Sequence, residues 1–181
     1  IGFVSPDFRS HPVGYALTDV IPQLKLYNFD LYAYYNFNYE DNFTKKFKKD
    51  FNYFFNIYEL DDEKVINKIR SDGIHILIDL AGYTDNNRLS IFFYRPAPVQ
   101  ISWLGYLPTT GIKEMDYKIG DPYIYSEMDK SNFYEKIVRL PSIWSNFTVS
   151  KNTNVPLNNF QEKDYIVFGC FASLKKINED V

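Results

Sequence analysis

The first 80 residues alternate between short apolar runs and segments in which apolar residues recur at helical spacing. Residues 1–4, 29–35 and 53–58 have the length and the flanking turn residues of buried strands. In 13–24, apolar residues recur every three or four positions, the spacing of one face of a helix. Strands that alternate with helices over short connections predict a parallel sheet with helices on its faces.

The most apolar run of the chain is Ile-His-Ile-Leu-Ile-Asp-Leu at 74–80. A nearly continuous apolar run is typical of a central parallel strand that is covered on both faces. Helices are expected at 43–49 and between 60 and 72. Further strands are expected at 99–103, 117–119 and 136–140. The predicted fold class is α/β, with a doubly wound, mostly parallel, Rossmann-like sheet.

The C-terminal part of the chain has a different composition. Residues 150–164 are polar and contain Pro156 and four asparagines, which predicts a linker. Residues 165–171 form another apolar run that can begin a second domain. The predicted organisation is a Rossmann-like lobe over 1–150, a linker over 151–164 and the truncated start of a second lobe over 165–181.

Composition and charge narrow the class of protein. The chain has 181 residues, of which 45% are hydrophobic, and no apolar run reaches the roughly 18 residues that a membrane span needs. Its net charge of −3 is unlike the basic surface of a general nucleic-acid binder. Cys170 is the single cysteine, so a disulfide or a cysteine metal site within the chain is excluded. Without a signal-peptide pattern, we expect a cytoplasmic protein.

His11 lies between the first predicted strand and the helix that follows it, with Pro12 at the first helical position. Ligands of open α/β sheets bind at the carboxyl ends of the strands, where this loop must lie. The positive end of the helix dipole lowers the pKa of a histidine there, which favours the neutral imidazole that a general base requires. The alternative is that His11 only caps the helix or hydrogen-bonds within the loop.

Two further loops follow predicted strands and should reach the same edge. The loop after 74–80 has a glycine that permits close backbone approach and two hydroxyl side chains, although an ordinary surface loop fits equally well. The loop at 103–111 combines glycines, a proline and adjacent hydroxyls, which indicates a shaped loop with exposed amides. The candidate ligand-binding residues of these two loops are Gly82, Tyr83, Thr84, Gly105, Tyr106, Thr109 and Thr110.

The sequence lacks several catalytic signatures. It has no paired-carboxylate pattern, no cluster of metal ligands and no Gly-x-Gly-x-x-Gly fingerprint, so metal-dependent hydrolysis and dinucleotide chemistry are disfavoured. A Gly-x-Ser-x-Gly elbow is also absent, which disfavours an α/β hydrolase. His75 comes at the amino end of its strand, and we expect it at the opposite edge of the sheet.

Five segments in register resemble one known family. Residues 1–12, 72–84 and 95–106, extended by 134–141 and 168–177, resemble the catalytic region of the protein O-GlcNAc transferases. That family includes SPINDLY-type enzymes and bacterial homologues fused to tetratricopeptide repeats. The resemblance covers nearly the whole chain, and several motifs in the same order make it more specific than any one of them.

The resemblance implies the N-terminal catalytic lobe of a GT-B glycosyltransferase, a fold of two Rossmann-like lobes with the active site between them. It implies His11 as a base toward the acceptor hydroxyl, with Pro12 and the two glycine-containing loops on the cleft side. It implies no metal or other cofactor, a nucleotide-sugar co-substrate, and tetratricopeptide repeats upstream. The residues that hold the nucleotide diphosphate belong to the second lobe in that family.

The leading hypothesis is therefore a fragment of an inverting glycosyltransferase. It would transfer a sugar, N-acetylglucosamine from UDP-GlcNAc or fucose from a GDP donor, to serine or threonine hydroxyls of proteins. The fragment alone is expected to be inactive, because half of the cleft is absent. The alternative is a non-catalytic module, derived from such a lobe, that binds a protein or peptide. Neither hypothesis involves a nucleic acid or a membrane.

Overall fold

The chain divides into two compact units, Ile1–Thr148 and Val149–Val181. The computed structural model describes residues 1–126, 131–146, 164–167 and 169. The predicted linker lies outside the described residues, except for its last position. Of the predicted strand at 165–171, the described positions belong to no strand, and the others lie outside the described residues. The predicted linker and second lobe therefore stay predictions.

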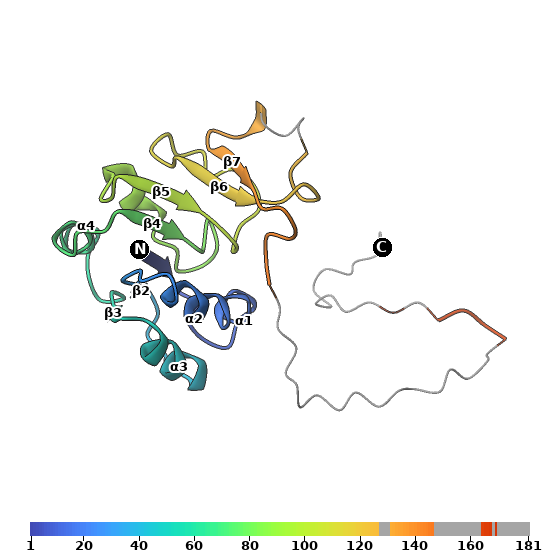
Figure 1. Ribbon diagram of the computed structural model, residues 1–181, viewed down its shortest axis with the longest axis horizontal. Coiled ribbons are helices and arrows are strands. Elements are labelled where there is room, and N and C mark those ends of the chain that lie inside the picture. The colour runs from blue at the N-terminus through green and yellow to red at the C-terminus, as the bar shows by residue number, and fades with distance from the viewer. Residues whose placement is uncertain (127–130, 147–163, 168, 170–181) are drawn as a thin grey trace. The chain divides into compact units, whose positions relative to one another are not determined.

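The described part of the first unit is built on a seven-stranded sheet in the order β3-β2-β1-β4-β5-β6-β7. Each pair of neighbouring strands is parallel, and the arrows of β4, β5 and β6 point the same way in Figure 1. The strands are β1 (Gly2–Ser5), β2 (Tyr32–Tyr35), β3 (Tyr53–Asn56), β4 (Ile76–Asp79), β5 (Val99–Ser102), β6 (Tyr117–Gly120) and β7 (Lys136–Arg139). The helices are α1 (Pro12–Leu17), α2 (Val20–Lys25), α3 (Asn42–Asp50), α4 (Asp62–Ser71) and the 3₁₀ helix η1 (Leu89–Tyr94). The predicted doubly wound α/β sheet is confirmed.

Side chains that alternate along the strands form a hydrophobic core on each face of the sheet. Phe3 of β1 and Ile78 of β4 pack in the cluster that α1, α2 and α3 cover. Their neighbours Val4 and Leu77 pack in the cluster under α4 and η1. β4 is the fourth of the seven strands, and Leu77 is fully buried, as its apolar run predicts for a central strand.

The helix expected over 13–24 is in fact two helices, α1 and α2, that break at Thr18 and Asp19. Pro22 explains the break, because a proline in the middle of a longer helix could not donate to the carbonyl of Thr18. In the first turn of α2, the missing N–H of Pro22 costs nothing. The freed carbonyl of Thr18 instead accepts a hydrogen bond from Lys46 Nζ at 3.0 Å.

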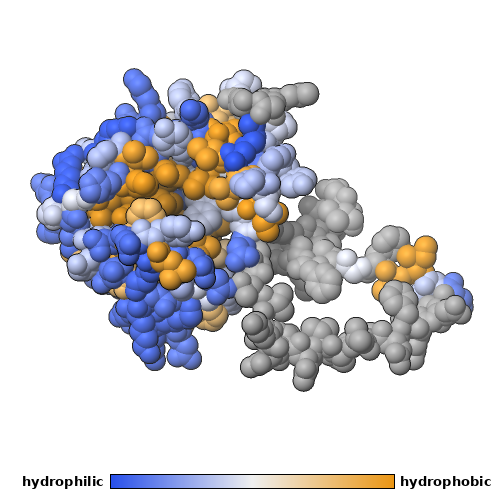
Figure 2. All heavy atoms as spheres, in the orientation of Figure 1, coloured by the Kyte–Doolittle hydropathy of each residue, from blue (hydrophilic) through white to orange (hydrophobic). Residues whose placement is uncertain are grey.

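The face of the molecule seen in Figure 2 is largely polar, with a hydrophobic area near the middle strands. Figure 2 shows hydrophobic residues at the surface in the region of β4 and β5, surrounded by hydrophilic residues. The partly buried residues of these two strands are Ile76, Val99 and Ile101. Among the described residues, no helix combines the length and the apolar character that crossing a membrane requires.

Phe8 anchors the loop that follows β1. Its ring is fully buried and meets Phe47, Phe51 and Phe54 at centroid distances of 5.6, 5.3 and 5.9 Å, each close to edge-on. Edge-to-face contacts of this kind add to the free energy gained by burial. The position of the loop with His11 is thus fixed by the core that α3 and β3 help to form.

Replacing Phe8 with alanine should lower the free energy of unfolding by about 3–5 kcal/mol, because it empties a buried ring site. Urea denaturation followed by circular dichroism measures this change. Phe93→Ala is the control, since the Phe93 side chain is 55% exposed and its loss should cost less than about 1 kcal/mol. Equal effects of the two substitutions would show that the aromatic cluster does not anchor the loop.

Candidate functional site

The backbone brings the three predicted loops to one edge of the sheet. β1 pairs with β4, and β4 pairs with β5, all parallel, so the loops that follow these strands are neighbours. His11 and Pro12 come from the first loop, and the residues around Gly82 and Gly105 from the other two. His75 directly precedes β4 and lies at the amino edge, as expected.

His11 is the N-cap residue of α1. Its Nδ1 accepts a hydrogen bond from the backbone N–H of Val13 at 3.3 Å, and Pro12 occupies the first helical position. The capping alternative raised by the sequence is therefore confirmed as a contact. Asp7 Oδ2 also lies 3.4 Å from the same Nδ1. The ring nitrogen thus faces both a donor and a carboxylate.

The pKa of His11 is lowered, as predicted, but the main cause differs from the helix dipole. The largest effect is burial of the ring, which disfavours the protonated form and so lowers the pKa. The negative charge of Asp7 raises the pKa, and the positive charge of the Arg9 guanidinium lowers it. Burial also raises the pKa of Asp7, which His11 and Arg9 oppose. The balance favours the neutral imidazole that a general base requires.

His11 opens onto a small, largely apolar cavity of about 190 Å³. Its walls come from α1, from the loop after β5, and from a segment that follows β7. That segment is held in place because Trp103 Nε1 donates to the carbonyl of Trp144 at 2.8 Å. The lining residues are His11, Pro12, Val13, Ala16, Leu104, Gly105, Trp144 and Ser145. The predicted residues His11, Pro12 and Gly105 therefore share one cavity.

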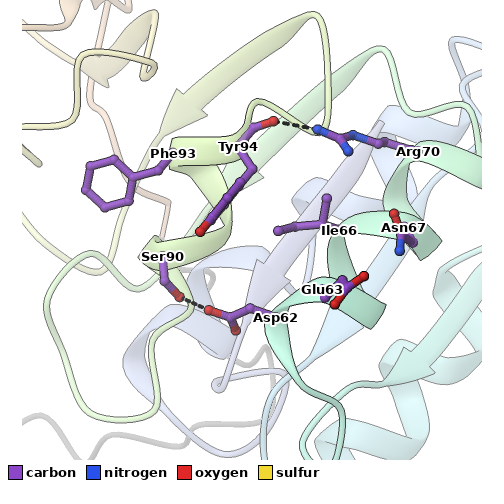
Figure 3. A pocket seen from close by; sticks show the side chains of 8 residues that line it. All are labelled: Asp62, Glu63, Ile66, Asn67, Arg70, Ser90, Phe93 and Tyr94. Atoms are coloured by element: carbon purple, nitrogen blue, oxygen red, sulfur yellow. Dashed lines mark hydrogen bonds between the residues drawn. The ribbon is translucent and has the colours of Figure 1, made fainter.

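A larger cavity of about 570 Å³ lies between α4 and η1 (Figure 3). Its walls are the sides of these helices rather than the loops that follow the strands. Two of its polar side chains bond to other residues of the lining: Asp62 accepts from the Ser90 hydroxyl, and Arg70 donates to the backbone carbonyl of Tyr94. None of the predicted site residues lines it, and we place the candidate site at the smaller cavity beside His11.

Two glycines let the second and third loops approach each other closely. A Cβ on Gly82 would lie 2.1 Å from the Cβ of Tyr106, and Gly82 has a φ of +58°. A Cβ on Gly105 would lie 2.1 Å from the carbonyl oxygen of Leu80. The two predicted glycines are therefore required by the packing of the loops against each other.

The predicted hydroxyl residues mostly hold these loops together. Tyr83 is 55% exposed, but its hydroxyl donates to the carbonyl of Thr110 at 2.5 Å. The Thr109 hydroxyl donates to Glu135 at 2.6 Å, and the buried Thr110 donates to the same carboxylate. Thr84 is exposed and donates to the carbonyl of Ala81 at 2.9 Å. Contacts of these residues with a substrate stay predictions.

A buried polar network beneath the loops escaped the sequence analysis. Asp79 accepts hydrogen bonds from the N–H groups of Ala81 and Gly82, at 3.2 and 2.8 Å. Lys118 donates to the Ser102 hydroxyl at 3.0 Å and to the carbonyl of Tyr106. The network therefore holds the backbone at the start of both loops.

Burial shifts both ionisable groups of this network toward their neutral forms. It raises the pKa of Asp79 to about 6, although the backbone N–H groups of Gly82 and Ala81 and the charge of Lys118 oppose the shift. Burial lowers the pKa of Lys118 to about 8, against the charges of Asp79 and Glu135. Asp79 is the one charged residue of the apolar run at 74–80, which was a usable signal in the sequence.

Asp7 and Trp144 also escaped the sequence analysis. The signal for Asp7 was a carboxylate four residues before His11 in the same loop. Trp144 gave no signal, because it joins the site from beyond β7 through a backbone carbonyl. Among the described residues, no group of three His, Cys, Asp or Glu side chains could hold a metal ion.

Comparison with known proteins shows the family of the chain. Residues 1–156 match the family described as glycosyl transferase family 41. One relative is a probable UDP-N-acetylglucosamine–peptide N-acetylglucosaminyltransferase SPINDLY of Solanum lycopersicum, which is 33% identical; the alignment covers the whole of this chain and 20% of that protein. Another is the UDP-N-acetylglucosamine–peptide N-acetylglucosaminyltransferase of Caenorhabditis elegans, which is 36% identical; the alignment covers 78% of this chain and 12% of that protein.

A solved structure is also similar. It is a lysine-to-methionine variant of the Thermobaculum terrenum O-GlcNAc transferase, with a TM-score of 0.77 and 35% sequence identity. The match covers 80% of this chain and 28% of that one. The described fold is thus the N-terminal, Rossmann-like lobe of a GT-B glycosyltransferase. The chain belongs to glycosyl transferase family 41. It spans about a fifth of the length of the SPINDLY relatives.

Replacing Gly82 with alanine should destabilise the protein more than replacing Gly111. Both glycines have positive φ, +58° and +66°, which costs an alanine about 1–2 kcal/mol at either position. Only at Gly82 does the added methyl meet Tyr106, so Gly82→Ala should cost about 1–3 kcal/mol more. Urea denaturation of the two variants measures the difference. Equal losses would mean that the two loops can separate without cost.

Replacing Asp79 with asparagine should remove a pH dependence of stability. Because the pKa of Asp79 is raised in the folded chain, the free energy of unfolding should fall as the pH rises from about 4 to about 6 and this carboxyl loses its proton. Asp79→Asn lacks this titration. Its free energy of unfolding, relative to that of the unsubstituted chain, should therefore rise by about 2–3 kcal/mol over this pH range. Parallel denaturation curves at several pH values test this. A constant difference between the two proteins would show that Asp79 titrates normally.

Proposed function

We propose that this chain is the N-terminal catalytic lobe of an inverting glycosyltransferase that modifies serine and threonine hydroxyls of proteins. The proposed donor is UDP-N-acetylglucosamine, because the relatives in tomato and the nematode are named for that transfer. The observation that carries the proposal is the position of His11, half-buried, with its pKa lowered by burial, and open to a cavity at the carboxyl edge of the sheet.

In the proposed reaction, the acceptor hydroxyl oxygen attacks the anomeric carbon while the bond from that carbon to the diphosphate oxygen breaks. The leaving diphosphate keeps the electron pair, and the hydroxyl proton passes to the imidazole of His11. A single displacement of this kind inverts the anomeric configuration. Positive groups of the second lobe would stabilise the charge that develops on the diphosphate.

The loops after β4 and β5 would form the cleft wall beside His11. Their hydrogen bonds to Glu135, which precedes β7, and to Asp79, at the end of β4, hold this wall in place, which favours precise positioning of a substrate. Our proposal includes no metal or other cofactor, since the diphosphate would be neutralised by side chains of the second lobe. The proposal also includes tetratricopeptide repeats upstream of this lobe and a cytoplasmic location.

The proposed function requires His11 in the complete protein that carries this lobe. His11→Ala should lower kcat by about 10²–10⁴-fold, the range that general acid–base catalysis contributes. The rate of sugar transfer from UDP-GlcNAc to an acceptor protein gives kcat, with the product detected by mass spectrometry and by a radiolabelled sugar. His75→Ala is the matched control, since this exposed histidine lies at the opposite edge and its loss should leave kcat unchanged.

Two results would contradict the proposal. Unchanged transfer by His11→Ala would remove the proposed base. Absence of any transfer by the complete protein, together with retained binding of a protein or peptide by His11→Ala, would support the non-catalytic binding module instead. Residues 1–181 alone are expected to show no transfer, because they contain only one wall of the proposed cleft.

A further inference from the structure

The proposed function depends on which ring nitrogen of His11 carries the proton, because only an unprotonated nitrogen can act as a base. A neutral imidazole carries one proton, on Nδ1 or on Nε2. If Nδ1 accepts from Val13 N–H, the proton sits on Nε2, and His11 cannot take a proton from an acceptor there. If Nδ1 carries the proton, Nε2 is free to act as a base.

Asp7 is placed to decide between these tautomers. Its Oδ2 lies 3.4 Å from His11 Nδ1, and its carboxylate is almost fully buried, with 4% of the residue exposed. The competing contact, from the Val13 N–H to the same nitrogen, is a hydrogen bond of 3.3 Å, so the two contacts have nearly the same length. Charge distinguishes them, because a buried carboxylate repels the lone pair of an unprotonated Nδ1 and attracts an N–H, whereas the amide is a neutral partner.

The carboxylate itself is held from two other directions. Arg9 Nη2 donates to Asp7 Oδ1 at 2.9 Å, which leaves Oδ2 directed at His11. The Asp7 backbone N–H donates to the buried Ser5 hydroxyl at 2.9 Å, at the end of β1. Asp41, in addition, accepts from the backbone N–H of Ser10 at 2.7 Å and ties the loop to α3. Asp7 therefore has little freedom to turn away from the ring.

We propose that Asp7 is a positioning residue that keeps the proton of His11 on Nδ1 and so leaves Nε2 unprotonated toward the cavity. This inference rests on the proposed function for its catalytic meaning, but the tautomer itself belongs to the lobe alone. The charged groups that act on the ring are Asp7 and Arg9 of its own loop. The cavity walls contributed by Leu104, Gly105 and Trp144 are uncharged.

The chain is well suited to a direct measurement, because it has only two histidines. In residues 1–181 labelled with ¹⁵N-histidine, NMR distinguishes a protonated from an unprotonated ring nitrogen, and His75→Ala assigns the two rings. The expected result is a protonated Nδ1 and a free Nε2 at His11 near pH 7. A protonated Nε2 in the unsubstituted chain overturns the proposal without any variant.

Asp7→Asn provides the second arm. Removal of the carboxylate should let Nδ1 accept from the Val13 N–H, so the proton should move to Nε2. Asp41→Asn is the matched control, because that carboxylate supports the same loop through Ser10 without touching His11, and the tautomer should stay on Nδ1. An Asp7→Asn chain that keeps the proton on Nδ1 overturns the proposal.

The kinetic arm uses the complete protein with UDP-GlcNAc and an acceptor. Asp7→Asn should lower kcat by about 10²-fold with little change in KM, since it alters proton transfer rather than binding. The acid limb of the pH profile should move to lower pH, because the charge of Asp7 raises the pKa of His11. A raised KM with unchanged kcat and pH profile would indicate a merely structural role and overturn the proposal. If the complete protein transfers no sugar while the tautomer behaves as expected, the proposed function fails and the positioning role of Asp7 stands.

Discussion

The site depends on the parallel register of β1, β4 and β5, which sets Val4 beside Asp79 and Asp79 beside Ser102. Three strands that end at the same level present three loops side by side. The register also buries the Asp79 carboxylate at the level where these loops begin. A buried carboxylate needs partners, and it finds them in the N–H groups of Ala81 and Gly82. Sheet geometry and loop shape are therefore a single constraint.

The same logic explains why the loop residues behave as they do. Gly82 and Gly105 are needed because each loop passes against backbone or a Cβ of its neighbour. The hydroxyls of Thr109 and Thr110 both donate to Glu135, so their first role is to shape the wall of the site. His11 differs from them, since its ring borders an open cavity and, among the described residues, the contacts of the ring with Val13 and Asp7 are both made at its Nδ1.

Much of the fold could be predicted from the sequence, because buried strands and helix faces leave a strong periodic pattern. The central strand at β4 is an example, and the edge that carries His11 followed from the order of strand and helix. The break at Thr18 was missed because apolar spacing continues through it, although Pro22 indicated where a single helix would fail. Contacts between distant segments, such as Trp144 with Trp103 and Lys118 with Tyr106, have no local pattern and required the structure.

The central claim is that His11 meets the acceptor hydroxyl in a cleft of which this lobe forms one wall. The most direct measurement is a crystal structure of the complete protein with a nucleotide-sugar analogue and an acceptor peptide. The account predicts the acceptor oxygen at about 3 Å from His11 Nε2, within hydrogen-bond reach. An acceptor bound with its hydroxyl beyond reach of His11, or at the amino edge beside His75, would contradict it.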